Sequence, residues 1–380
     1  MTYTKIDWND LYIKVFLSSF YVQDGIAEFH ATMELDEPYE KAEDQFRLLE
    51  KGVQRLMGIP ELKDTVLVWK RFFVSDAINQ SPFLMPSFGE AVSVIQQPPL
   101  NSGKASLLLY FVEKAQVSRI EDGSVVLQRP HYKHIYHTQL HERHGNVQEQ
   151  TEKIFDTYIE NLKNQSCTLE RNCIRTWIFV QDVDVQYAGM VTARKDFFER
   201  EGLTQQTHYI ASTGIEGRYI YPEVLMLMDT YAIGNIDPAQ IKFLQAPTHL
   251  NPTYEYGVTF ERGTSVDYGD RRHVFISGTA SIDNEGEVVH PMDVRKQTER
   301  TMENIQALLS EAEVTMQQIA HMIVYLRDIA DYAVVKDYMY HYYPDIPKVM
   351  VWAPVCRPGW LIEVECMAIK AISSPELAVF

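Results

Sequence analysis

The chain has 380 residues, of which 46% are hydrophobic and 23% charged, so its composition is that of a folded globular protein and excludes wholesale disorder. Its 35 Lys and Arg against 52 Asp and Glu give a net charge of −17, which argues against a general nucleic-acid or anionic-membrane surface. The sequence has no run of 18 apolar residues, no signal-peptide pattern and no CxxC among its four cysteines. We therefore expect a cytoplasmic protein without a membrane span or a nucleic-acid partner.

The first third predicts one helix followed by three strands. The segment KAEDQFRLLEKGVQRLM (41–57) has helical periodicity, and VLVWKRFFVSDA (66–77) is typical of a buried strand. The stretch from 88 to 112 predicts two strands around a Pro/Gly turn.

The middle third repeats this order more clearly. The segment QTEKIFDTYIENLK (150–163) predicts a helix, and RTWIFVQDV (175–183) predicts a strand. The stretch from 207 to 233 then predicts two strands around a turn, and it ends on the apolar run LMLMDTYAI.

The last third gives the same order again, with a strand in front and a second helix. A strand (273–282) precedes a helix (296–312), in which apolar residues recur on one face. A strand (321–329), a helical stretch (331–343) and two strands around a Pro/Gly turn (349–369) follow. The closing run LIEVECMAI aligns without a gap with LMLMDTYAI of the middle third.

The three segments predict an α+β fold built from three tandem units, at residues 1–115, 116–240 and 241–380. In each unit helices cover one face of a mixed sheet. The closing strands carry apolar residues on both faces, so the other sheet face must be buried as well. Three units can bury these faces against one another, which predicts a monomeric pseudo-trimer with three clefts between units.

One carboxylate distinguishes the last unit from the others. Glu363 lies in the closing strand, where the middle unit has Leu227 and the first has an apolar residue near Leu107–Leu109. Leu361, Ile362 and Val364 flank Glu363, so we expect its carboxyl group to be partly desolvated. Burial raises a carboxyl pKa toward the range of a general acid. The sequence therefore predicts one functional cleft and two structural ones.

A histidine-rich segment, HYKHIYHTQLHERH (131–144), precedes the middle helix. On a helix His137 and His141 would share a face and could bind a metal ion. We expect mostly strand here, where the spacings place the histidines on both faces. We expect no metal site.

The segments FISGTAS, QTERTMENIQALL, YLRD and LIEVECMAI of the last unit resemble the YjgF-like, or Rid, family. Members of that family form trimers of such units, with their sites in the clefts between subunits. They hydrolyse enamine and imine intermediates and hold the substrate carboxylate with an arginine after the proline that precedes the strand at 349–354. Lys348 stands there in this chain.

A closer resemblance, from about residue 170 to 372, is to the chorismatases, a Rid-like group that cleaves chorismate. Five short motifs of that family occur in its order. They are Arg175-Thr176-Trp177, the turn from Ile210 to Ile215, the stretch from Tyr256-Gly257 to Phe260-Glu261-Arg262, Ile276-Ser277-Gly278-Thr279-Ala280, and Leu361-Ile362-Glu363-Val364-Glu365. The family's His-Tyr-Pro is replaced by Leu250-Asn251-Pro252.

The chorismatase resemblance implies the role of each candidate site residue. The family's catalytic acid falls on Glu363, and the two positions associated with 3-hydroxybenzoate formation fall on Gly278 and Cys356. Thr279 belongs to the same motif as Gly278 and is expected in the substrate site. Chorismate carries two carboxylates and an enol ether, and the expected carboxylate ligands are Arg175, Arg262 and Arg357.

The predicted function is therefore cleavage of the enol ether of chorismate or a related small carboxylated metabolite, with release of pyruvate and a product of the 3-hydroxybenzoate type. No cofactor is expected. Two alternatives stay open: a Rid-type enamine or imine hydrolase, and a non-catalytic protein that binds a small metabolite.

Overall fold

The computed structural model describes residues 1–35, 41–84 and 89–380, and it contains three six-stranded sheets. The first sheet has the order β1-β2-β3-β6-β4-β5, the second β11-β10-β12-β9-β8-β7, and the third β13-β14-β15-β18-β16-β17. The predicted α+β fold of three tandem units is confirmed.

Each sheet is built from one continuous part of the chain. The first contains β1 (Thr2–Trp8), β2 (Ile13–Phe20), β3 (Glu28–Leu35), β4 (Thr65–Val74), β5 (Ala91–Gln96) and β6 (Ala105–Glu113). The second contains β7 (Gln116–Arg119), β8 (Val125–Gln128), β9 (Lys133–His141), β10 (Cys173–Val180), β11 (Ala211–Glu216) and β12 (Met226–Gly234). The third contains β13 (Ile241–Leu244), β14 (Gly263–Asp267), β15 (Arg271–Ala280), β16 (Ile319–Leu326), β17 (Lys348–Trp352) and β18 (Ile362–Ala371).

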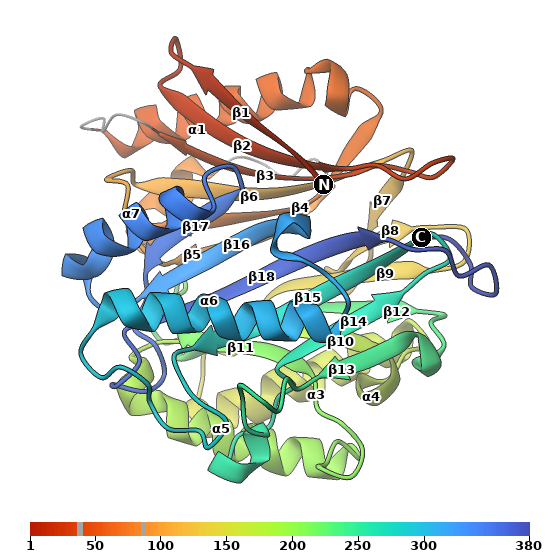
Figure 1. The fold of residues 1–380 in the computed structure, drawn as a ribbon, viewed down its shortest axis with the longest axis vertical. Helices are drawn as coiled ribbons and strands as arrows, with labels where there is room; N and C mark the ends of the chain where they lie inside the picture. The colour runs from red at the N-terminus through yellow and green to blue at the C-terminus, as the bar shows by residue number, and fades with distance from the viewer. Residues whose placement is uncertain (36–40, 85–88) are drawn as a thin grey trace.

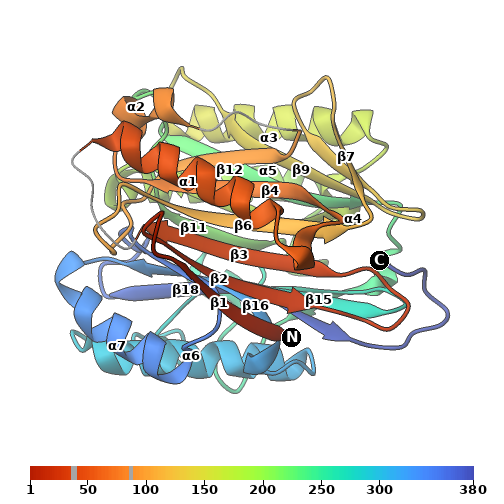
Figure 2. The same cartoon turned by 90° about the horizontal axis from the view of Figure 1, so that it is seen from above.

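The longer helices lie on the outside of the molecule, and the sheets face one another inside (Figures 1 and 2). These helices are α1 (Ala42–Met57), α3 (Val147–Asn164), α5 (Val183–Arg200), α6 (Val294–Glu311) and α7 (Tyr332–Tyr342). One hydrophobic cluster includes residues of all three sheets, such as Trp69, Phe179 and Phe275, and so forms a common core. In the part of the chain that the structure describes, no helix is long and apolar enough to cross a membrane.

The helices begin where the sequence supplies a cap. Asn146 and Glu149 form a capping box at the start of α3, and the side chain of Asp293 accepts a hydrogen bond from the amide of Lys296 at the start of α6. The first unit differs from the others after β4. Its second helix, α2 (Ala77–Gln80), has a single turn and is followed by a short 3-10 helix that contains Pro82, a residue that disrupts an α-helix interior.

The units contact one another head to tail. The edge strand β5 of the first unit packs against β9, β11 of the second packs against β15, and β17 of the third packs against β6. This closes a cycle of three interfaces.

All three interfaces carry a buried ion pair. The pairs are Arg71–Asp229 between the first and second units, Arg175–Glu365 between the second and third, and Arg271–Glu28 between the third and first. In the third interface, strand register places Val349 where the other two have Ser93 and Thr213. It places Leu108 where they have the carboxylates of Asp229 and Glu365.

Candidate active site

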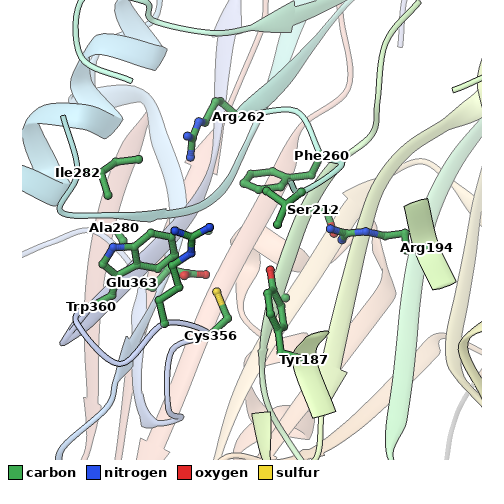
Figure 3. A pocket seen from close by; sticks show the side chains of 14 residues that line it. Tyr187, Arg194, Ser212, Phe260, Arg262, Ala280, Ile282, Cys356, Trp360 and Glu363 are labelled. Carbon is green, nitrogen blue, oxygen red and sulfur yellow. The ribbon is translucent and has the colours of Figure 1, made fainter. Parts of the chain in front are cut away.

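A pocket lies between the second and third units (Figure 3), at the kind of interface between structural units where small-molecule sites usually form. The second unit contributes side chains from α5 and β11, and the third contributes β15, the segment before β14 and the segment around the start of β18. The lining residues are Tyr187, Arg194, Ser212, Gly214, Val258, Phe260, Arg262, Gly278, Ala280, Ile282, Cys356, Arg357, Trp360 and Glu363.

Glu363 is the carboxyl group of this cavity. It pairs with Tyr325 of β16 and Ala280 of β15, and only 4% of its surface is exposed. Burial, and then the neighbouring charge of Glu365, raise the pKa of Glu363 to about 8, although Arg175 and Arg262 act in the opposite direction. The carboxyl group is therefore protonated at neutral pH and can act as a general acid.

Strand register shows how this acid is unique among the repeats. The closing-strand residue opposite Phe179 of β10 is Leu227, the one opposite Tyr325 of β16 is Glu363, and the one opposite Phe73 of β4 is Ser106. The sequence interpretation of an apolar residue near Leu107–Leu109 was wrong by one position, because only pairing in the sheet fixes the alignment of the divergent first unit. Neither other unit carries an acid there.

Gly278 lies directly against the acid. A Cβ atom at Gly278 would stand 1.9 Å from Oε1 of Glu363, which is far inside contact distance. Gly278 lies in a bulge of β15, where the pairing with β18 shifts between Ile276 and Thr279. The bulge and the missing side chain together make room for the Glu363 carboxyl group.

Three arginines line the cavity. Arg262 is 5% exposed and donates from Nε and Nη2 to the backbone oxygen of Asn251. Arg357 lies over the ring of Trp360, with 5.2 Å from Cζ to the ring centroid, and Arg194 enters from α5 with 1% of its surface exposed. Figure 3 shows Arg194 and Arg262 on different sides of the space above Glu363. Such a set can hold more than one carboxylate.

Arg175 has a different place from the one expected. Its guanidinium group donates to Oε2 of Glu365 at 2.9 Å, and it does not line the cavity. The Rid-family arginine position is also occupied differently here. Lys348 lies in the interface with the first unit, 4.3 Å from the ring centroid of Tyr340, and the matching position of the second unit, which does line the cavity, is Ser212.

The remaining two expected site residues differ in their surroundings. Cys356 lines the cavity, and burial, with the charge of Glu363, raises the pKa of its thiol to about 12, so it is a neutral wall residue rather than a thiolate nucleophile. Thr279 does not line the cavity, whereas its neighbours Gly278 and Ala280 do, and its hydroxyl group donates to the backbone oxygen of Ser277 at 2.9 Å.

Sequence reasoning missed several lining residues, above all Tyr187 and Arg194. Both lie on α5 of the second unit, and nothing in the sequence shows that this helix faces an acid of the third. Glu365 was also missed as a functional neighbour. Its alternation with Glu363 on β18 places both side chains on one face, and that signal was present in the sequence.

The histidine-rich segment forms strand β9, as expected. Within residues 1–35, 41–84 and 89–380, no group of three or more His, Cys, Asp or Glu side chains could hold a metal ion.

Comparison with known proteins identifies the family. The model of the family described as Endoribonuclease L-PSP matches residues 265–370. A RutC family protein from Pyrococcus abyssi is 35% identical over 100 residues, which cover 26% of this chain and 78% of that protein. The chain belongs to the RutC, or YjgF-like, family.

Another member, the 3-aminoacrylate deaminase RutC from Acinetobacter baylyi, is 30% identical over 97 residues, which cover 25% of this chain and 77% of that protein. The full three-unit fold is shared with a chorismatase whose crystal structure is known. That structure aligns with a TM-score of 0.63 at 17% identity, over 82% of this chain and 96% of its own. The chain is thus a YjgF-family protein with a chorismatase-like fold and an enzyme-like cavity.

Proposed function

We propose that the protein cleaves the enol ether of chorismate, or of a closely related dicarboxylate, with Glu363 as the general acid. The observation that carries the proposal is the buried, protonated Glu363 in a cavity lined by Arg194, Arg262 and Arg357. The chorismatase-like fold and the YjgF-family membership agree with this assignment.

The chemistry follows from the charges of the site. Glu363 transfers its proton to the methylene carbon of the enol ether, and the positive charge that develops is shared with the ether oxygen. The carboxylate left on Glu363 stabilises this charge, while the arginines hold the two substrate carboxylates.

Two outcomes balance the atoms of this reaction. If water adds to the cation, the resulting hemiketal releases pyruvate and a ring diol. If the ring also expels its neighbouring hydroxyl group and a ring proton as water and becomes aromatic, the water released offsets the water that adds to the cation. Pyruvate and 3-hydroxybenzoate then together contain all the atoms of chorismate. In both cases a proton returns to Glu363.

The test is incubation with chorismate and measurement of pyruvate. We expect the wild-type protein to release pyruvate and Glu363→Gln to lose about 10²–10⁴-fold in rate, the usual contribution of a positioned general acid. The matched control is Glu34→Gln, because Glu34 is also a carboxyl group whose pKa is raised by burial but does not line this cavity. Unchanged chorismate in the presence of excess wild-type protein would refute the proposal.

A second candidate is enamine hydrolysis, favoured by the 30% identity to the RutC deaminase. An enamine, like an enol ether, is activated by protonation of its vinyl carbon, so Glu363 would perform the same step. Ser212 replaces the Rid arginine at this cavity, so the substrate carboxylate would have to bind to another arginine. Faster keto-acid release from the product of an amino-acid dehydratase, without pyruvate from chorismate, would select this function.

A further inference from the structure

A buried cluster joins the second and third units directly behind the acid. We call it the Glu365 cluster, and it consists of Glu365, Arg175, Thr213 and Trp177. Glu365 lies two residues after Glu363 on β18 and is 3% exposed. Its Oε2 accepts from Arg175 at 2.9 Å and from the hydroxyl of Thr213, and its Oε1 accepts from Nε1 of Trp177 at 2.7 Å. All three donors belong to the second unit.

The hydroxyl of Thr213 connects this cluster to the backbone that supports the acid. It accepts a hydrogen bond of 2.9 Å from the amide of Gly278, the residue against which Oε1 of Glu363 lies. The neighbouring Ser277 is fixed as well, because its hydroxyl group accepts from the amide of Ser212 at 2.9 Å and donates to the backbone oxygen of Glu261 at 2.6 Å. The bulge of β15 is therefore fastened to β11 across the interface.

The charges that face Glu363 come from both units. The second unit presents Arg175 of β10 and the α5 side chains Tyr187 and Arg194. The third presents Glu365, Arg262, Cys356 and Arg357, together with Tyr325 on β16. Glu365 is the one carboxylate in this set, so it opposes ionisation of Glu363 while the arginines favour it.

We propose that the Glu365 cluster positions Glu363: Thr213 fixes the Gly278 backbone beneath the carboxyl group, and Glu365 supplies the negative charge that keeps the acid in its proton-donating form. The proposal rests on Glu363 being the acid of the proposed reaction. It assigns Arg175, Thr213 and Glu365 as positioning residues, since they do not line the cavity.

The interface between the first and second units contains a natural control. There Arg71 donates to Asp229 at 2.8 Å and to the hydroxyl of Ser93 at 3.2 Å, at the positions that match Glu365 and Thr213. The closing strand has Leu227 in place of Glu363. This second cluster holds together an interface that lacks a counterpart of Glu363. A test of the proposal must therefore separate the positioning of Glu363 from the stability of the interface.

The experiment compares pH profiles of pyruvate release from chorismate. We expect Glu365→Gln to move the alkaline limb of kcat/KM down by about one pH unit, because the remaining neighbours of Glu363 are mostly cationic. The matched variant Asp229→Asn should lower the melting temperature to a similar extent and leave the profile in place. A Glu365→Gln profile that coincides with that of Asp229→Asn would overturn the proposal.

A second pair of variants keeps the test valid if Glu365→Gln fails to fold. Thr213→Val should reduce kcat about tenfold with little change in KM, and Thr213→Ser should restore it, because serine retains the hydroxyl group bonded to Gly278. Ser93→Ala is the matched control and should not alter kcat. Equal effects of Thr213→Val and Ser93→Ala would contradict positioning.

A readout without substrate separates the two proposals. The infrared band of the protonated carboxyl group that disappears in Glu363→Gln can be titrated in the wild type and in Glu365→Gln. A lower midpoint in Glu365→Gln, in a protein that releases no pyruvate, would support the positioning role and refute chorismate cleavage. An unchanged midpoint would refute the positioning role whatever the activity.

Discussion

At the scale of single residues, ionisation of the buried Glu363 carboxyl group destabilises the folded protein. The pKa of Glu363 rises from 4.5 to about 8 on folding, so the folded protein retains a proton that the unfolded chain releases as the pH rises through 4.5. Its contribution to stability is therefore fully present below pH 4.5 and is lost progressively up to pH 8. The shift corresponds to at most about 5 kcal/mol.

The consequence can be measured by denaturant unfolding of Glu363→Gln at several pH values. We expect this variant to be close to the wild type at pH 5 and more stable at pH 9, by up to about 5 kcal/mol, because glutamine carries no charge to desolvate. Glu285→Gln, a change at an exposed position, should show no such trend. A pH-independent difference between Glu363→Gln and the wild type would contradict the assigned pKa.

Arginines show which residue roles a sequence can predict. Arg262 and Arg357 were expected in the site and do line the cavity. Arg357 lies in the segment before β18, and Arg262 directly precedes β14, which pairs with β15. The position of Arg175 in a strand is compatible with a substrate ligand and with one half of a buried ion pair. Only the structure, which places Glu365 beside it, shows that Arg175 forms the ion pair. Arg194 could not be assigned, because its helix belongs to the neighbouring unit.

At the scale of elements, the bulge in β15 determines where the acid lies. β3, the equivalent strand of the first unit, pairs with β6 without a register shift, whereas β15 shifts against β18 at Ser277 and Gly278, as β9 of the second unit does against β12. A bulge adds one residue to a strand and redirects its neighbours. The sequence predicted the strand itself from its apolar residues, but the bulge leaves no periodic signal.

Gly278→Ala tests the role of this element. The added methyl group would stand 1.9 Å from Oε1 of Glu363, so the carboxyl group must move, and we expect pyruvate release to fall by about tenfold or more. Gly359→Ala is the control, because its added Cβ would meet only the partly exposed side chain of Val288, at 3.3 Å. Full activity of Gly278→Ala would show that the close contact does not constrain the acid.

At the scale of the whole molecule, the three interfaces are variations on one design. Each contains a guanidinium–carboxylate pair whose side chains are almost completely buried, but in the third interface this pair is Arg271–Glu28, and Val349 and Leu108 stand at the positions that match the hydroxyl group and the carboxylate of the other two. The three-unit architecture itself was predictable, because apolar closing strands on both sheet faces require a partner surface. The sequence indicated which interface holds the cavity only through Glu363, which the other two units replace with Leu227 and Ser106.

The apolar residues Val349 and Leu108 suggest a rescue experiment. We expect Arg71→Met to lower the free energy of unfolding by about 3–5 kcal/mol, because it leaves the Asp229 carboxylate buried without its cation. The double variant Arg71→Met/Asp229→Leu should regain most of that loss, since the third interface has the apolar residues Ile323 and Leu108 at the matching strand positions. Denaturant unfolding checks both, and a double variant as unstable as the single one would contradict this view.

The unequal interfaces also bear on how the protein responds to ligand concentration. A trimer of identical subunits has three equivalent clefts, so occupancy of one can influence the next. Here Ser106 and Leu227 occupy the position of the acid in two units, so the proposed reaction has its acid at one interface of the described chain. Saturation of a single molecule should then be hyperbolic, with a Hill coefficient of one. In a single polypeptide the residues of each interface are encoded separately, so one interface can carry an acid that the other two lack.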